Sequence, residues 1–314
     1  MPHESSAPGS EAVRLPLARA GMDRDHAARE RDGLLDSLWA DAATRILPIL
    51  DGQTLLAEPG RIALLPVDRV PRPALSVYLG RTTADAPGAP SGTPVVAALL
   101  EDAAQLAEAD WVGLRQVGHV LEPLDAGMFT QALAILNWHA SHPFSPRTGE
   151  ATAVEQAGWV RRDPVSGDVV FPRTDPAVIV GVLDADDRML LGANALWEAN
   201  RYSLLAGFVD PGESLEAAVV REIEEESGVR VRDPRYVGSQ PWPFPASLMI
   251  GFIARVDERD PGELRPDGTE IIDLRWFSRD ELREEVAAGR VALPGGASIA
   301  RAIIEHWLGE AERP

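Results

Sequence analysis

The 314-residue sequence predicts an α/β protein in which a small α+β domain precedes a C-terminal α/β/α sandwich with a mixed sheet. Residues 177–183 (AVIVGVL) form a nearly continuous apolar run, which is typical of a strand buried on both faces. An amphipathic helical pattern follows at residues 215–227. Residues 34–120 instead alternate short apolar runs with turn signals. These patterns predict two domains of different construction.

Composition excludes several classes of protein. The chain carries 49 acidic and 30 basic residues, a net charge of −19, and every basic residue is arginine. A surface this acidic argues against sequence-independent binding of nucleic acid through a basic patch. The absence of cysteine excludes disulfides and thiolate metal sites, and it is consistent with a reducing cytosol. No apolar run approaches the roughly 20 residues of a membrane span, so we expect a cytoplasmic protein without a membrane segment.

Residues 1–31 are polar, rich in Ala and Arg and weakly patterned, which predicts a mobile tail or loosely docked arm. Residues 32–142 are predicted to form the α+β domain. Its expected elements are a hairpin at 54–67 that turns at Pro59–Gly60, strands at 74–80 and 93–100, and a helix at 125–142. Arg115 is the one residue of this domain that we single out, although its spacing alone indicates an ordinary surface arginine.

Residues 174–314 are predicted to form the sandwich. Besides the strand and helix above, its expected strands lie at 188–194, 202–209, 230–238, 248–256 and 270–277. Two helices are expected to close the chain at 278–289 and 297–311. Ser278 and Ser298 are the predicted N-caps of these helices.

One predicted helix of the sandwich has a crowded acidic face. Ser214 stands at its N-cap position, and Gly228 follows its last periodic turn. Glu222 is three residues from Glu225 and four from Glu226, so the three carboxylates share one patch and repel one another. A cation would offset this repulsion, and an oxygen-only ligand set suits Mg²⁺ or Mn²⁺. The alternative is an ordinary solvated acidic face.

The spacing around this helix resembles the Nudix box, Gly-x5-Glu-x7-Arg-Glu-U-x-Glu-Glu-x-Gly-U, where U is a bulky aliphatic residue. Its fixed positions are filled by Gly207, Glu213, Arg221, Glu222, Ile223, Glu225, Glu226, Gly228 and Val229. The resemblance implies a loop–helix–loop that holds divalent metal ions against a diphosphate. It implies Glu222 and Glu226 as metal ligands and Glu225 as a ligand or a supporting group. Arg221 and Glu213 would brace the loop.

Residues 239–247 (SQPWPFPAS) combine three prolines with two aromatic rings, which makes a stiff segment. From the residues alone, the segment could pack aromatics onto the core or bind a substrate. Downstream of a Nudix box, it resembles the signature of the NADH pyrophosphatase (NudC-type) family, in which it belongs to dinucleotide recognition. The substrate-site residues that this resemblance implies are Arg115, Phe171, Phe208, Gln240, Pro241, Trp242, Pro243, Phe244, Pro245, Ala246, Ser247, Met249 and Ala300.

The same resemblance implies two further metal ligands. A lone Glu before a strand is usually solvated, but the family has an acidic residue there that completes the metal shell. Glu270 fits that position, with Asp267 and Asp273 as less favoured neighbours. The match also implies the backbone carbonyl of Ala206 as a ligand.

Residues 143–173 are predicted to form a degenerate zinc-ribbon-like segment. The family carries two Cys-x2-Cys pairs there. The corresponding places in this chain hold Ser145, Thr148, Asp163 and Ser166. Hydroxyls do not replace thiolate or imidazole ligands, and His139 with His142 would make only half a site, so we do not expect zinc. Hydrogen bonds and packing around Trp159 would have to maintain the ribbon-like shape of this segment without a metal ion.

The two motifs together predict a hydrolase that splits the pyrophosphate of NADH or NAD⁺ into AMP and a nicotinamide mononucleotide. The resemblance implies two or three Mg²⁺ or Mn²⁺ ions per site, which would neutralise the phosphates and activate water. The catalytic residues would be Glu222, Glu225 and Glu226, and the general base is open between the last two. The family also implies a homodimer.

Other functions are left open by the sequence. The substrate could be ADP-ribose, a diadenosine polyphosphate or the NAD cap on an RNA 5′ end, although the acidic surface would make any RNA contact local. In a different class, the chain could be a non-catalytic nucleotide sensor on a Nudix scaffold. Such modules usually lose box carboxylates, and this chain has all of them.

Overall fold

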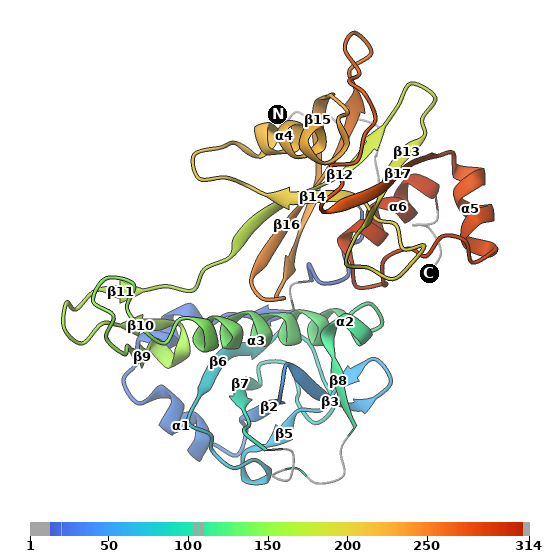
Figure 1. The fold of residues 1–314 in the computed structure, drawn as a ribbon. Helices are drawn as coiled ribbons and strands as arrows, with labels where there is room; N and C mark the ends of the chain where they lie inside the picture. Colours follow the sequence, from blue (N-terminus) through green and yellow to red (C-terminus); the bar gives the residue numbers. More distant parts are fainter. Residues whose placement is uncertain (1–12, 20, 103–105, 107–109, 310–314) are drawn as a thin grey trace, which may run out of the picture.

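The computed structural model describes residues 13–19, 21–102, 106 and 110–309 of the chain. Two lobes are visible in Figure 1, each built around its own β-sheet, as the sequence predicts. In these described residues, no helix is both long and apolar enough to cross a lipid bilayer.

The N-terminal lobe is built on a five-stranded sheet of order β1-β6-β7-β2-β5. Its strands are β1 (Met22–Asp23), β2 (Arg45–Ile49), β5 (Leu65–Pro66), β6 (Ser76–Thr82) and β7 (Pro94–Leu99). Successive side chains of a strand point to opposite faces. Leu79 therefore packs with α3 (Pro123–Ser141), whereas Tyr78 packs with α1 (Leu34–Ala40).

A smaller three-stranded sheet of order β4-β3-β8 completes this lobe. Its strands are β3 (Gln53–Glu58), β4 (Arg61–Ile62) and β8 (Trp111–Gly113), and α2 (Leu114–Val117) follows β8 directly. Strands β3 and β4 pair antiparallel across Pro59–Gly60, which confirms the predicted hairpin. Short 3-10 helices lie at η1 (His26–Glu30) and η2 (Val67–Arg69).

Composition predicts a mobile tail or a loosely docked arm for residues 1–31, and the described residues of this range form a docked arm. Leu15 packs into the core of the C-terminal lobe, and Leu17, which is 1% exposed, packs into that of the N-terminal lobe. A Cβ atom on Gly127 of α3 would lie 2.3 Å from the Arg19 carbonyl oxygen, so only glycine admits this close approach. The described residues 13–31, here called the N-terminal arm, are thus tightly docked. Residues 1–12 and 20 lie outside the described part of the chain.

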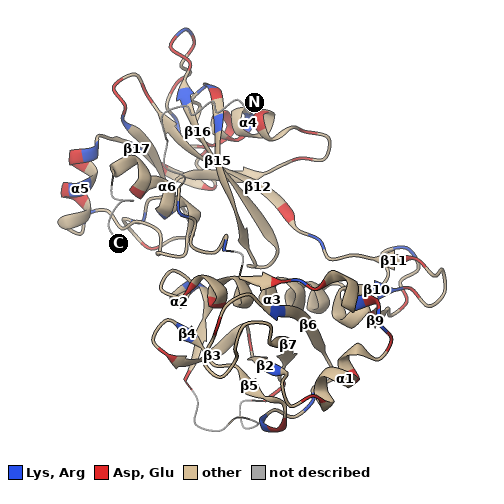
Figure 2. Cartoon of the chain, turned by 180° about the vertical axis from the view of Figure 1, so that it is seen from behind, with Lys and Arg blue, Asp and Glu red and all other residues tan. Residues whose placement is uncertain are grey.

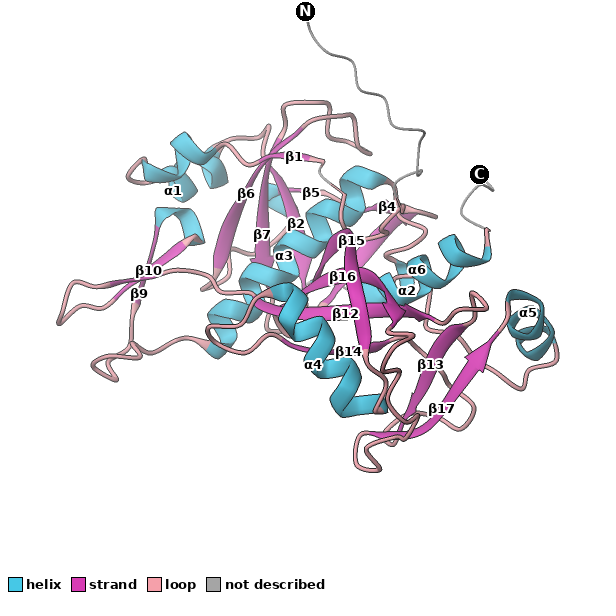
Figure 3. Cartoon of the chain, turned by 90° about the horizontal axis from the view of Figure 1, so that it is seen from above, coloured by secondary structure: helices cyan, strands magenta, loops and turns pink. Residues whose placement is uncertain are grey.

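The C-terminal lobe is the predicted sandwich. Its six-stranded sheet has the order β15-β16-β12-β13-β17, with β14 paired to β12. The strands are β12 (Asp175–Leu183), β13 (Met189–Asn194), β14 (Leu205–Phe208), β15 (Val231–Trp242), β16 (Ser247–Val256) and β17 (Ile271–Phe277). Helix α4 (Leu215–Ser227) packs on one face, and α5 (Arg279–Ala287) and α6 (Ile299–Leu308) pack on the other (Figure 3).

Strand β12 accounts for the apolar run from which the fold was predicted. Val178 and Val180 pack toward α4, whereas Ile179 and Leu183 pack toward α6, so both faces are buried. Strand β12 runs parallel to β16 and antiparallel to β13 and β14. The sheet is therefore mixed, as predicted.

The ribbon-like segment links the lobes as a three-stranded sheet of β9 (Ala153–Glu155), β10 (Val160–Arg162) and β11 (Val169–Val170), with η4 (Gln156–Gly158) after β9. Two tight turns stand where the zinc-binding pairs would be. In one, the Gly149 amide donates to the Ser145 carbonyl (3.0 Å), and in the other the Gly167 amide donates to the Asp163 carbonyl (2.9 Å).

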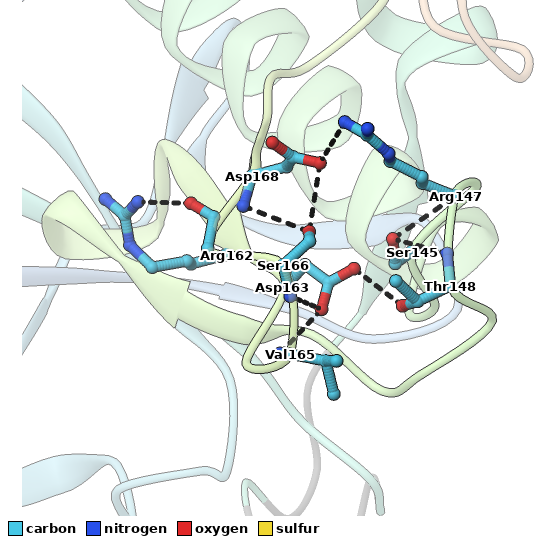
Figure 4. Close-up of polar contacts among 9 residues, drawn as sticks. Ser145, Arg147, Thr148, Arg162, Asp163, Val165, Ser166 and Asp168 are labelled. Atoms are coloured by element: carbon cyan, nitrogen blue, oxygen red, sulfur yellow. Dashed lines mark hydrogen bonds and ion pairs between the residues drawn. The ribbon is translucent and has the colours of Figure 1, made fainter.

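The Asp163 carboxylate joins these two turns (Figure 4). One oxygen accepts from the Thr148 hydroxyl (2.6 Å), and the other accepts from the Val165 and Ser166 amides (2.8 and 3.1 Å). The side chain is fully covered from solvent. Its hydrogen bonds, first with Ser145 and then with Thr148, hold the Asp163 pKa well below its usual range. A buried carboxylate thus connects the turns that a metal ion would otherwise connect.

The two histidines that were considered as half of a zinc site have other partners. His139 is buried, its Nε2 lies 2.8 Å from the Gly158 carbonyl, and its Nδ1 lies 2.9 Å from the Arg161 guanidinium. Burial lowers the His139 pKa to about 4. His142 Nδ1 lies 2.8 Å from the Ser141 hydroxyl.

We expect Asp163→Ala to lower the melting temperature, because it leaves the Thr148 hydroxyl and two amides without their acceptor. Thermal unfolding followed by circular dichroism would measure the change. Asp168→Asn is the control, since it alters a half-exposed carboxylate of the same segment that forms a surface ion pair with Arg147. Stoichiometric zinc in the purified protein, measured by elemental analysis, would contradict this account of the segment.

Candidate active site

Helix α4, which carries the acidic face, is fixed at both ends. The Ser214 hydroxyl accepts a hydrogen bond from the Ala217 amide (3.1 Å), and Gly228 ends the helix with a φ of 70°. Both caps are confirmed predictions. Val219 and Ile223 bury the apolar face against the sheet.

Arg221 is the centre of the polar face of α4. Its guanidinium donates to both oxygens of Glu213 (2.9 and 2.8 Å) and to the Phe208 carbonyl (2.9 Å), which ties the preceding loop to the helix. It also donates to Glu222 (2.7 Å) and Glu225 (3.2 Å). Paired charges of this kind favour both ionised forms, so the Arg221 pKa is raised and the Glu213 pKa is lowered. The structure therefore contains the brace that the box implies.

Glycine at position 207 is required by the closeness of Glu222. A Cβ atom there would lie 2.0 Å from the Glu222 carboxyl carbon. Strand β14 can therefore approach α4 only if this position has no side chain.

Glu226 is the most perturbed carboxylate of the site. Its side chain is buried at 6% exposure, and its Oε2 atom has no hydrogen-bond partner among the described residues. Burial, followed by the charges of Glu270 and Glu222, raises the Glu226 pKa to about 8, while a hydrogen bond with the Ala206 backbone opposes the rise. A buried acceptor without a donor, among like charges, is suited to binding a cation.

Glu270 is the acidic residue near β17 that is available to the site. The Asp267 carboxylate accepts hydrogen bonds from three backbone amides of its own turn, at 2.6, 2.8 and 3.0 Å. Asp273 accepts a hydrogen bond from the Tyr202 hydroxyl. Among the described residues, the Glu270 carboxylate has only the Asn194 side-chain amide as a partner (3.2 Å), and Glu270 lines a cavity together with Glu226.

This cavity, here called the acidic pocket, has a volume of about 190 Å³. Its lining includes Asn194, Ser203, Ala206, Glu226, Trp242, Met249, Glu270 and Ala300. Among the described residues, no three His, Asp or Glu side chains already converge as a ligand cage. Glu222 in particular is held by Arg221. The residues fit a divalent cation by charge and by the orphan oxygen of Glu226, and the carboxylates would have to close around it.

The SQPWPFPAS segment forms the hairpin between β15 and β16, and its tip docks on the N-terminal lobe. The Asn137 amide of α3 donates to the Pro243 and Pro245 carbonyls (2.8 and 3.2 Å). The Trp242 and Phe244 rings meet edge to face with centroids 4.9 Å apart, and both pack against the core of the N-terminal lobe.

Arg115 of α2 lies over these two rings. Its guanidinium carbon is 4.2 Å from the Phe244 centroid and 5.4 Å from the Trp242 centroid, within the range of cation–π attraction. Arg115 lines a second cavity of about 560 Å³ together with Pro243, Phe244 and Pro245. Residues that are 127 positions apart in sequence, Arg115 and Trp242, thus share one site.

Comparison with known sequences shows the family to which this chain belongs. A profile of the NUDIX domain matches residues 172–294, and one described as "NADH pyrophosphatase-like rudimentary NUDIX domain" matches residues 43–138. The NAD-capped RNA hydrolase NudC of Mycobacterium tuberculosis (strain ATCC 25618 / H37Rv) is 41% identical over 303 residues, 93% of this chain and 94% of that protein. This chain belongs to the NudC-type NADH pyrophosphatase family of Nudix hydrolases.

Other matches of this Nudix chain are shorter. The human NAD-capped RNA hydrolase NUDT12 is 39% identical over 200 residues, which cover 60% of this chain and 43% of that protein. A solved NUDIX hydrolase from Nitrosomonas europaea is 26% identical, with a TM-score of 0.35, over 45% of this chain and 93% of that one.

The structure brings only part of the expected substrate site together. Ala206, Glu226, Trp242, Met249, Glu270 and Ala300 line the acidic pocket of this family member, and Arg115, Pro243, Phe244 and Pro245 line the adjacent cavity. Phe171 and Phe208 are 66% and 60% exposed and line neither. Pro241, Ala246 and Ser247 shape the hairpin, where the Ala246 carbonyl accepts from the Asp175 amide (2.8 Å) and Ser247 pairs with Trp242.

Gln240 is a correction to the list of substrate contacts. Its side chain is fully buried, it accepts a hydrogen bond from the Leu17 amide (3.0 Å), and it donates to the Ala297 carbonyl (3.0 Å). Both of its polar atoms are therefore occupied, and it positions the hairpin against the N-terminal arm. Asn137 and Asn194 are site residues that sequence reasoning missed. Asn137 lies within an apolar helical pattern, and Asn194 ends an apolar strand pattern. A polar residue in such a position can indicate a site, but the sequence does not identify the residue that it contacts.

We expect Gly207→Ala in this Nudix protein to displace Glu222 and to lower the hydrolase activity by about 100-fold, a loss typical of misplaced active-site groups. Steady-state assays would measure the rate, with circular dichroism to confirm the fold. Gly295→Ala is the matched control, since its added Cβ would meet nothing within 4 Å. Equal loss in both variants would contradict a specific role for Gly207.

We expect Glu226 to make metal-free stability depend on pH. Its pKa of about 8 in the folded state exceeds the unfolded value near 4.3, so folding is favoured by the protonated form. The stabilisation is complete below pH 4 and is lost as pH rises through about 8, by up to about 1.4 kcal/mol per pH unit. Urea unfolding in chelator at pH 5, 7 and 9 would measure it. Glu226→Gln should abolish this part of the pH dependence, whereas parallel curves for wild type and variant would refute it.

Proposed function

We propose that this protein hydrolyses the pyrophosphate of NADH and NAD⁺ to AMP and a nicotinamide mononucleotide, with a divalent cation. The observation that carries the proposal is the acidic pocket, where Glu226 and Glu270 face Trp242 of the SQPWPFPAS hairpin. Carboxylates for a cation and a ring for a nucleotide base thus line the same cavity. Membership of the NudC-type family supports the choice of dinucleotide.

The residues that would hold Mg²⁺ or Mn²⁺ are Glu222, Glu226 and Glu270, with Glu225 and the Ala206 carbonyl as further candidates. When bound, such an ion would offset phosphate charge and lower the pKa of water. Nudix hydrolases generally need divalent metal ions, and two or three per site stay a prediction for this chain. We do not propose a zinc site in this protein.

Glu225 and Glu226 are both candidates for the general base. Glu225 is 63% exposed and its carboxylate pairs with Arg221, whereas Glu226 lines the pocket but would also hold the cation. Water would add to one phosphorus, the bond from that phosphorus to the bridging oxygen would break, and one of these two carboxylates would accept the proton from water. Arg115, Trp242 and Phe244 would hold the dinucleotide by stacking and by charge.

A second candidate substrate is the NAD cap at the 5′ end of an RNA. Relatives named NAD-capped RNA hydrolases favour it, one of them matching this chain over 93% of its length. ADP-ribose and diadenosine polyphosphates stay alternatives of the same chemistry. A non-catalytic sensor is disfavoured by the complete set of box carboxylates.

A homodimer and a cytoplasmic location stay predictions. The exposure of Phe171, 66%, would suit a ring that contacts a partner subunit. Gel filtration with light scattering would test this idea, and a fully active monomer would refute it.

We expect Glu226→Gln to lower the rate of NADH hydrolysis by about 100-fold or more while the fold is kept. Glu224→Gln is the matched control, since Glu224 is an exposed residue of the same helix that pairs with Arg230. Products from NADH, NAD⁺, ADP-ribose, diadenosine tetraphosphate and capped RNA would be separated by chromatography, with Mg²⁺ or Mn²⁺ and with a chelator. AMP and reduced nicotinamide mononucleotide, lost on chelation, are expected from NADH.

Near-wild-type turnover by Glu226→Gln would refute the role of Glu226. Hydrolysis of ADP-ribose but not NADH would keep the Nudix chemistry and reject the assignment of the hairpin. Binding without hydrolysis of any of these substrates would favour the alternative of a non-catalytic nucleotide sensor.

A further inference from the structure

A third cavity, of about 370 Å³, lies outside the proposed active site and is here called the arginine pocket. Its walls come from the N-terminal arm, helix α3, Trp159, residues 172–174 and Pro241. A cavity of this size between separate parts of the chain is typical of small-molecule sites.

The charge of the arginine pocket is opposite to that of the whole chain. Arg19, Arg24 and Arg173 line it, and none of its described lining residues is acidic, although the chain has 49 acidic and 30 basic residues. Along the ribbon, acidic and basic residues are otherwise interspersed in both lobes (Figure 2). Arg14 adds a further positive charge close enough to act on Arg19. Such a cluster would be stabilised by an anion.

Protein groups satisfy these arginines only in part. Arg19 donates from Nη1 to the Leu121 carbonyl (2.9 Å) and is acted on by Glu122, but its buried Nε has no partner among the described residues. Arg173 has Asp175 at 2.6 Å, in a pair that is exposed. Arg24 lies over the Trp159 ring, 5.9 Å from its centroid. Donors are therefore left for a ligand.

Apart from Thr130, Gln131 and Thr174, the rest of the arginine pocket is apolar, and it includes an aromatic ring of fixed orientation. The Trp159 Nε1 donates to the Tyr78 carbonyl (2.7 Å), and Arg29 lies 3.7 Å from the ring centroid. Ile135 and Pro241 contribute apolar surface. Guanidinium groups beside an aromatic and apolar wall match a phosphate attached to a flat base.

We propose that the arginine pocket binds a nucleoside monophosphate unit. Two sources have this chemistry: a free mononucleotide such as AMP, or a nucleotide of an RNA strand that follows an NAD cap. The second source rests on the proposed function. Pro241 lines the arginine pocket and the next residue, Trp242, lines the acidic pocket, so strand β15 connects the two sites.

The test compares the double variant Arg24→Gln/Arg173→Gln with wild type, because both side chains are exposed and their loss should leave the fold intact. The double variant Arg232→Gln/Arg259→Gln is the control, with the same change of charge at exposed positions away from the arginine pocket. Calorimetric titration with AMP in chelator tests the free mononucleotide. A comparison of NADH hydrolysis with hydrolysis of NAD-capped RNA tests whether the arginine pocket binds a nucleotide of the RNA.

If a free mononucleotide binds, the pocket variant should bind AMP about tenfold more weakly or worse, the loss expected for one charge-assisted hydrogen bond. If an RNA strand binds, the pocket variant should lose about tenfold in kcat/KM for capped RNA and keep its rate on NADH. Equal AMP affinity and equal capped-RNA hydrolysis in pocket and control variants would overturn the proposal. The AMP titration tests the arginine pocket even if the wild type hydrolyses neither substrate. A failure of the proposed function can therefore be distinguished from a failure of this proposal.

Discussion

The carboxylates of α4 repel one another, and the surrounding residues are arranged to contain that repulsion. Arg221 contacts Glu213, Glu222 and Glu225, so one guanidinium partly compensates three negative charges and also holds the loop before the helix. Glu226 is left out of this compensation and carries the remaining electrostatic cost in a buried position. The helix therefore keeps one uncompensated carboxylate, for which a cation is the natural partner.

This arrangement depends on the second lobe as well. The hairpin that brings Trp242 to the acidic pocket is held at its tip by Asn137 and at its base by Gln240, whose partners lie in the N-terminal arm and in the loop before α6. The Gln240 amide is fully buried, so without these hydrogen bonds it would lose its water with no replacement, whereas the hydrogen bonds of Asn137 are partly exposed. The N-terminal lobe thus positions the hairpin that borders the acidic pocket, although none of its described residues lines that pocket.

Sequence patterns predicted the parts of the molecule whose structure is decided locally. The apolar run of β12, the caps Ser214 and Gly228, and the hairpin at Pro59–Gly60 all follow from spacing and turn chemistry, and the structure confirms them. Contacts across long sequence separations could not be predicted in this way. Gln240 meets Leu17 across 223 residues, and nothing in either neighbourhood specifies the other. Family resemblance put Gln240 on the substrate side, whereas the contacts make it a support.

The N-terminal arm shows why composition alone could not decide between a mobile tail and a docked arm. Polar, arginine-rich residues predict disorder when too little apolar surface is available to offset the entropy of ordering. In this arm Leu15 and Leu17 enter the cores of the two lobes, and β1 pairs with β6. Gly127 also allows close backbone contact with the arm. Once the leucines fix the arm, its arginines lose the freedom to spread into solvent, and Arg19 and Arg24 are held beside one cavity. Apolar anchors at two positions thereby concentrate positive charge in a protein whose surface is otherwise acidic.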